Sequence, residues 1–407
     1  MSLTSTQGRP HPGQAPESPR RGLTATFGLA LGTFAVGTDA FVLAAFLPSM
    51  ASGLHVSQAA AGQSITVFAV AYALLAPLLA TLTARLERRA LLVGALGMLA
   101  LANLGSALAP NLAVLLATRV LAAVGAAAYT PNAGAVGAAL VRPELRARAL
   151  AVVIGGLTVA TALGVPLGGL ANRWLGWRSA LVLVAVLSLL AGVGVLARVP
   201  ALPGSPRVPL RKRLDALRRP GVLAVLPLTA LGMAASYTAY AYAVPALHAV
   251  GVDAGDVSLM LFLYGLGAVL GNLLAGVVTD RWGAAPLLTG AYVAMAGSLA
   301  LLAWIAARGD APAWAVGVLV ALWGGGSWSQ TPPQQHRLIS AAPEQAPLLV
   351  SLNSSAIYLG ISAGTASGGL ALAHGPTAAY GLGAALAVVA LAFLTATARK
   401  AQGPSAR

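Results

Sequence analysis

The sequence predicts an all-α, polytopic membrane protein with twelve transmembrane helices in two pseudo-symmetric six-helix bundles. Three observations lead to this prediction. Of the 407 residues, 58% are hydrophobic and only 9% are charged, whereas a soluble domain has about 25% charged residues. The apolar residues form a series of segments of membrane-spanning length, and several local patterns return after a fixed offset of 196 residues.

A transmembrane helix needs about 20 mainly apolar residues. Division of the chain at its polar breaks gives segments of about this length at 23–47, 59–83, 90–108, 113–138, 149–171, 179–197, 221–247, 256–278, 286–306, 313–335, 347–371 and 377–398. We therefore expect an N-terminal bundle over 23–198 and a C-terminal bundle over 221–398. A basic linker at 199–220 joins them, and polar tails at 1–22 (disordered, and not a signal peptide) and 399–407 flank them.

The positions of Lys and Arg predict the orientation in the membrane. If the N-terminus is cytoplasmic, nearly all basic residues fall in the tails, the linker and the other cytoplasmic loops, and only Arg173, Arg178 and Arg308 fall on the outer side. This is the positive-inside bias, so we expect a protein of the cell (inner) membrane with both termini in the cytoplasm. The net charge of +15 then reflects topology, and no nucleic-acid partner is expected.

The two halves resemble each other in sequence. Thr-Ala-Arg at 83–85 returns as Thr-Asp-Arg at 279–281, and Gly164 in the fifth segment corresponds to Gly360 in the eleventh. Two six-helix repeats in the same orientation are typical of secondary transporters, whose substrate site lies near the midplane between the halves.

Asp39 is the one acidic residue in the apolar interior of a predicted span, and Arg119 is its basic counterpart in the fourth span. A charge at the bilayer centre costs about 2.5–3.5 kcal/mol on insertion scales and needs a partner. Both residues lie roughly 9–12 Å from the outer ends of their helices at 1.5 Å per residue, so we expect an ion pair. The pair either locks the N-terminal half or makes Asp39 a proton site. The second half has Ala235 and Ala315 at the equivalent positions.

Four motifs carry a resemblance to a known family. They are Gly-Thr-Asp-Ala-Phe-Val at 37–42, Arg-x-x-x-x-x-Gly at 119–125, Gly-Val-Pro-Leu-Gly-Gly at 164–169 and Gly-x-x-x-Asp-Arg-x-Gly at 276–283. The chain resembles the major facilitator superfamily, and within it the twelve-span drug:proton antiporter group that includes chloramphenicol-resistance and arabinose-efflux-like permeases. The first-half copy of the loop motif, at 80–89, lacks the Asp and both glycines, and Glu87 is the candidate substitute.

The resemblance implies roles for residues at the membrane edge and in the fifth span. Arg85, Asp280, Arg281 and Gly283 would form a cytoplasmic gate; the alternative is that they set topology and contact lipid headgroups. Gly164, Pro166 and Gly168 would form a bend that seals or hinges the outer half, and small residues at this spacing also permit close helix packing.

In this fold the first, fourth, seventh and tenth spans line the substrate cavity, and the eleventh adds to it. The residues expected to line it are Thr38, Tyr129, Asn132, Tyr237, Tyr240, Trp323, Trp328, Gln330, Asn353 and Tyr358. Aromatic rings and amides in an apolar chamber suit a small, moderately lipophilic organic solute.

The resulting prediction is a proton-coupled exporter of small organic or drug-like molecules that works by alternating access, of the multidrug-resistance type. The alternative is a permease or exporter of a defined metabolite such as a sugar or amino acid. An enzyme is not expected, because the chain has no cysteine and no His-Glu-x-x-His zinc motif. It also has no phosphate-binding loop of an ATP-driven pump, and a channel would not need two repeated halves. We expect no cofactor or metal, a proton gradient as the energy source, a functional monomer, and a small-molecule substrate and the lipid bilayer as partners.

Overall fold

The computed structural model describes residues 19–142, 145–204, 215–309, 311–341 and 346–402. Within these ranges the chain is helical and has no strands, which confirms the predicted fold class. Most of the predicted N-terminal tail, the central part of the basic linker and the last five residues lie outside the described residues.

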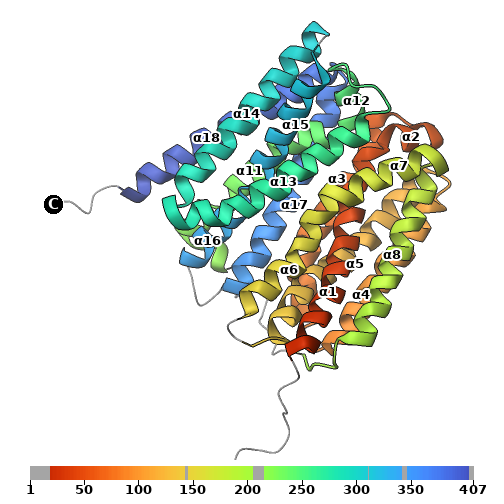
Figure 1. Ribbon diagram of the computed structural model, residues 1–407, viewed down its shortest axis with the longest axis vertical. Coiled ribbons are helices and arrows are strands. Elements are labelled where there is room, and N and C mark those ends of the chain that lie inside the picture. The colour runs from red at the N-terminus through yellow and green to blue at the C-terminus, as the bar shows by residue number, and fades with distance from the viewer. Residues whose placement is uncertain (1–18, 143–144, 205–214, 310, 342–345, 403–407) are drawn as a thin grey trace, which may run out of the picture.

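The first half of the chain forms one bundle (Figure 1). Its helices are α1 (Pro19–Phe41), η1 (Val42–Ala45), α2 (Leu47–Gly53), α3 (Gln58–Leu82), α4 (Arg88–Ala107), α5 (Leu112–Ala139), α6 (Arg146–Val159), η3 (Ala160–Gly164), α7 (Val165–Leu175) and α8 (Trp177–Arg198). Side chains cap three of the long helices: the Ser57 hydroxyl accepts a hydrogen bond from the Ala60 amide, the Asn111 side chain accepts one from the Val114 amide, and Glu87 caps α4. Such caps satisfy backbone donors that the first helical turn leaves free.

The second half forms the other bundle. Its helices are η4 (Ala216–Arg218), α10 (Pro220–Leu223), α11 (Leu226–Tyr240), α12 (Ala243–His248), α13 (Val257–Trp282), α14 (Ala284–Arg308), α15 (Ala313–Trp328), α16 (Thr331–Ala341), α17 (Ala346–Leu372) and α18 (Pro376–Gln402). The repeat that the sequence predicts is visible in the helix boundaries. Helices α4 and α14 begin at Arg88 and Ala284, and α2 and α12 begin at Leu47 and Ala243; each pair is 196 residues apart.

The tenth predicted span is divided in the structure. Helix α15 ends at Trp328, and α16 begins at Thr331 with Pro332 and Pro333 in its first turn, where proline fits because those amides have no intrahelical partner. Eleven helical segments among the described residues are long and apolar enough to cross a membrane. The tenth predicted span is the one that is missing from these eleven, because it is divided between α15 and α16 and neither helix reaches the required length alone.

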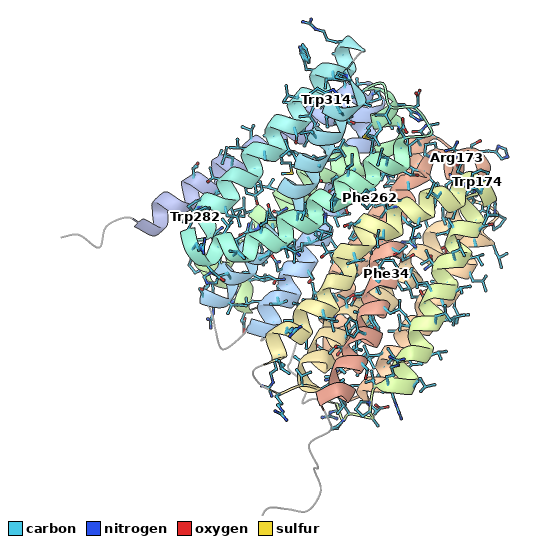
Figure 2. All side chains as sticks on the ribbon, viewed as in Figure 1. Phe34, Arg173, Trp174, Phe262, Trp282 and Trp314 are labelled. Atoms are coloured by element: carbon cyan, nitrogen blue, oxygen red, sulfur yellow. The ribbon has the colours of Figure 1, made fainter. Side chains whose placement is uncertain are left out.

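We call the end of the molecule that carries α2 and α12 the outer end, following the charge bias, and the opposite end the inner end (Figure 1). Exposed tryptophans mark both ends. Trp174 and Trp314 are 79% and 74% exposed near the outer end, and Trp282, the last residue of α13, is 69% exposed at the inner end (Figure 2). Tryptophan is enriched at both membrane–water interfaces, so these positions fit a bilayer-spanning molecule.

The two bundles meet at the outer end and near the middle of the molecule. The backbone of Gly265 lies against Ala162 of the other bundle, Gly369 lies against Ala59, and α12 packs on α2 and η1. A small cavity of about 220 Å³ lies in this seam, lined in part by Ser49 and His248. Towards the inner end, α6 and α13 run apart (Figure 1). The arrangement is therefore closed at the outer end.

Candidate functional site

Asp39 of α1 and Arg119 of α5 form a buried ion pair. Arg119 Nη1 lies 2.6 Å from Asp39 Oδ1, and Nη2 lies 3.3 Å from Oδ2 and 3.2 Å from the Asp39 carbonyl oxygen. The two residues are 0% and 1% exposed. The prediction that these side chains meet is confirmed. Two parallel N–H···O contacts fix the orientation of the guanidinium as well as its position.

Close packing of α1 against α6, η3 and α7 holds Asp39 in place. The Thr33 hydroxyl donates a hydrogen bond to the Val153 carbonyl of α6. A Cβ atom at Gly164 would collide with Thr38 of α1, and one at Gly168 would collide with Val42 of η1, so only glycine permits this approach. Thr38 itself donates to the Phe34 carbonyl within α1. Gly164 and Gly168 thus take part in close helix packing, the alternative that the sequence analysis left open for them, and their role in a bend stays a prediction. The role of Thr38 as a cavity residue gains no support from this hydrogen bond.

The region expected to bend contains a π-helical turn, η3, which ends two residues before Pro166. Proline has no amide hydrogen, so it removes one hydrogen bond from a helix and disfavours regular α geometry before it. Single π-helical turns of this kind are frequent at functional sites. The η3 backbone contacts both α1 and Gly265 of α13, so this irregular turn lies in the outer contact between the bundles.

Two predicted cavity residues make their hydrogen bonds inside the N-terminal bundle. Tyr129 is fully buried against Gly32, and its hydroxyl donates to the Leu29 carbonyl. The Asn132 side-chain oxygen accepts a 2.7 Å hydrogen bond from Arg88. The structure places both side chains in contacts that join helices of one bundle, and their prediction as substrate contacts gains no support.

Four other predicted residues, Tyr237, Tyr240, Trp323 and Trp328, belong to one buried aromatic cluster. Tyr240 stacks beside Tyr264 with 4.4 Å between ring centroids, and Trp323 Nε1 donates to the Ser236 hydroxyl, which also contacts the Tyr264 hydroxyl. Phe41 reaches this cluster from the other bundle. Its ring centroid lies 5.5 Å from that of Trp328 and 6.4 Å from that of Tyr237.

The aromatic cluster contains a buried polar atom, the Tyr240 hydroxyl, that has no hydrogen-bond partner within the described part of the chain. The Ser327 and Trp328 side chains, in contrast, lie within reach of the Tyr264 hydroxyl. Buried polar groups are normally paired, so the Tyr240 hydroxyl is available to a bound solute or to water. The sequence analysis missed Tyr264 and Phe41. Phe41 follows Asp39 by two residues, but an apolar span gives no signal of which face contacts the other half.

The predicted amides Gln330 and Asn353 lie in a polar part of the C-terminal bundle. The Tyr292 hydroxyl donates to Gln330 Oε1 at 2.9 Å, and the Thr229 hydroxyl donates to Asn353 Oδ1 at 3.1 Å. Asn353 Nδ2 is buried and lacks a partner among the described residues. Tyr358, the last predicted cavity residue, stacks on Tyr72 of the other bundle with 3.8 Å between centroids.

The predicted cytoplasmic gate residues lie at the inner end. Arg85, Asp280 and Arg281 are exposed, and Gly283 ends α13 with a φ of 83°, a conformation that favours glycine. Among the described residues, the one salt bridge is that of Asp39 and Arg119, so Asp280 is not ion-paired in this arrangement. A role for these residues as a gate stays a prediction.

Glu87 caps α4 and holds the start of the linker. Its carboxylate accepts hydrogen bonds from the amides of Arg89, Ala90 and Leu202, and the Arg88 amide donates to the Leu202 carbonyl. Desolvation raises the pKa of Glu87, but these hydrogen bonds and the Arg89 charge together lower it below its usual value. Glu87 thus supplies a carboxylate in the first-half loop at 80–89, which lacks an equivalent of Asp280.

Two repeated helical bundles, with a buried ion pair inside the first, are the architecture of a secondary membrane transporter. The chain belongs to the Major Facilitator Superfamily, whose family model matches residues 29–247 and 226–407.

Several relatives match most of the chain. It is 35% identical over 394 residues to the chloramphenicol resistance protein of Streptomyces lividans, covering 93% of this chain and 98% of that protein. It is 32% identical over 378 residues to the inner membrane transport protein YdhP of Escherichia coli K12, with coverage of 91% and 95%. A solved bacterial homologue of the human lysosomal transporter Spinster, in an inward-facing and unoccupied conformation, shares the fold. Its TM-score is 0.69 at 18% identity, covering 96% of this chain and 100% of that one.

Proposed function

We propose that this transporter exports small organic or drug-like molecules in exchange for protons, and that Asp39 is the proton site. The observation that carries the proposal is the bidentate, fully buried contact between Asp39 and Arg119. An ionisable residue within a membrane span is a functional candidate by default. Asp39 is also close to the contact between the bundles, because Phe41 two residues later touches Trp328 of the other half.

Alternating access requires that the charge of this site responds to the position of the bundles. Neutralisation of Asp39 by a proton removes the anion that compensates Arg119 in a low-dielectric environment, where such interactions are strong. The guanidinium must then find other partners, and this need favours a different arrangement of the helices. A proton taken up from one side and released on the other would thereby drive the solute in the opposite direction.

The aromatic cluster supports a small organic solute. It offers ring faces together with the unpartnered Tyr240 hydroxyl, a combination that suits a molecule with an apolar body and a hydrogen-bonding group. A relative whose name is chloramphenicol resistance protein favours export over uptake. The alternative, transport of a defined sugar or amino acid, keeps the same energy coupling and differs in the solute. We place the protein in the inner membrane as a monomer with both termini in the cytoplasm.

Transport in everted membrane vesicles tests the proposal. Addition of a panel of candidate solutes to energised wild-type vesicles should dissipate the pH gradient, as reported by a fluorescent dye, and should lead to accumulation of the transported solute. Asp39→Asn should abolish accumulation against a gradient and retain solute binding. Asp253→Asn, which neutralises an exposed carboxylate, is the matched control and should behave as wild type. Wild-type accumulation by Asp39→Asn, with unchanged pH dependence, would exclude Asp39 as the coupling residue.

A further inference from the structure

A continuous row of rings leads from Arg119 to the opposite bundle. The Arg119 guanidinium carbon lies 4.6 Å from the centre of the Phe68 ring of α3. Phe68 meets Tyr358 of α17 edge-on, with 6.0 Å between centroids, and Tyr358 stacks on Tyr72. Phe68 and Tyr72 are both 1% exposed, and Tyr358 is 7% exposed. The ion pair and the contact between the bundles thus share one aromatic cluster.

The Phe68 ring is the second partner of Arg119. Asp39 takes both terminal nitrogens of the guanidinium, while Phe68 covers its face. A cation over the face of a desolvated ring is attracted by the ring quadrupole, so this contact remains important if Asp39 loses its charge. Arg119 Nε is buried and has no hydrogen-bond partner among the described residues, so neutral Asp39 would leave the guanidinium with few other options. A shift of Arg119 therefore presses on Phe68.

Phe68 is not free to move alone, because Tyr358 packs against it. Tyr358 in turn is fixed to its own bundle. Two residues beyond it, Gly360 contacts the α11 backbone at Ala230, and Gly364 does so at Ala234. Added Cβ atoms would overlap these carbonyl oxygens, so α11 and α17 are in backbone contact. Because closely packed interiors transmit small displacements, a movement of Tyr358 displaces this pair of helices rather than a single side chain.

We infer that Phe68 and Tyr358 transmit the state of the Asp39–Arg119 pair to the contact between the bundles, and that Tyr358 is the positioning residue of the C-terminal half. This inference rests on the proposed role of Asp39. It assigns to Tyr358 a mechanical function in place of the predicted solute contact. Tyr72, on which Tyr358 stacks, supports the ring from the N-terminal side.

A double-mutant cycle with a distance readout tests the inference. The chain has no cysteine, so spin labels can be attached at Ser52→Cys and Ala254→Cys alone. Both residues are exposed at the outer ends of the two bundles, and the distance between the labels, measured by pulsed electron paramagnetic resonance, reports opening of the outer end. We expect Asp39→Asn to change the ratio of open to closed molecules at least about threefold, within the coupling range of contacting residues. In a Tyr358→Leu background, Asp39→Asn should leave this ratio unchanged, whereas a Tyr358→Phe background should retain the response.

Tyr380→Leu is the matched control. Tyr380 is a buried tyrosine of the same bundle, and its ring packs edge-on to Trp323 with 6.2 Å between centroids. It should lower stability similarly and leave the response to Asp39→Asn intact. Equal responses in the wild-type and Tyr358→Leu backgrounds would overturn the inference, as would the absence of any response in the wild type. The vesicle assay is independent: loss of coupled transport in Asp39→Asn alongside equal distance responses would retain the proposed function and reject the aromatic link.

Discussion

The buried ion pair predicts a pattern of stability that separates structure from function. Asp39→Leu leaves Arg119 without its anion inside the N-terminal bundle. Asp39→Leu combined with Arg119→Met removes both charges and keeps similar side-chain volumes. We expect the single variant to be strongly destabilised and the double variant to be at least as stable as wild type, without recovering proton-coupled transport.

The magnitude follows from the geometry. Loss of one partner from a buried ion pair costs about 3–5 kcal/mol, because the remaining charge is uncompensated. Arg119 retains two partial compensations in the single variant, namely the backbone carbonyl of residue 39 at 3.2 Å and the Phe68 ring, so we expect about 3 kcal/mol. Replacement of both charges by apolar side chains is often neutral or stabilising by about 1–4 kcal/mol, so the double variant should be at least as stable as wild type.

Equilibrium unfolding in mixed detergent micelles measures these differences, and everted vesicles measure transport by the same variants. If the double variant is as unstable as Asp39→Leu, the pair is not an exchangeable structural unit and the electrostatic reasoning is wrong. If the double variant is stable and still accumulates solute against a gradient, the pair has no role in coupling.

Three further predictions concern packing, topology and pH. Gly364→Ala should destabilise the protein by about 1–3 kcal/mol, because the added Cβ would overlap the Ala234 carbonyl. The control Gly276→Ala adds a Cβ that meets no atom within 4 Å and should unfold like wild type. Equal unfolding of the two variants would refute the packing argument. A cysteine at Ala201 should be protected from an impermeant reagent added to intact cells, while one at Ala254 should react; the reverse would invert the topology. Because the folded-state pKa of Glu87 is lowered, its stabilisation is complete above the unfolded pKa of about 4.3 and is lost as pH falls through the folded value. Glu87→Gln should therefore lower the melting temperature at neutral pH and converge with wild type in acid, and a constant difference down to about pH 3 would contradict this.

The sequence by itself determined the class of fold, the repeat and the ion pair. Long apolar segments with few charges leave the backbone no hydrogen-bond partner in lipid other than itself, so they form helices. The offset of 196 residues predicted equivalent helix starts, and Arg88 and Ala284 begin α4 and α14 at that spacing. Asp39 and Arg119 were identifiable because an isolated charge in an apolar span requires a partner of opposite charge. The sequence placed these two residues at similar depths in their spans, so each was the candidate partner of the other.

Only the tertiary structure decided which apolar and aromatic residues meet. In a membrane span hydrophobicity does not distinguish a lipid-facing side from a buried side, since lipid tails are as apolar as a protein core. Sequence alone therefore could not separate Tyr129, which hydrogen-bonds inside its own bundle, from Tyr358, which stacks on the opposite one. It also could not find Phe68, because a phenylalanine in an apolar helix acquires a role only when the fold places a guanidinium on its face.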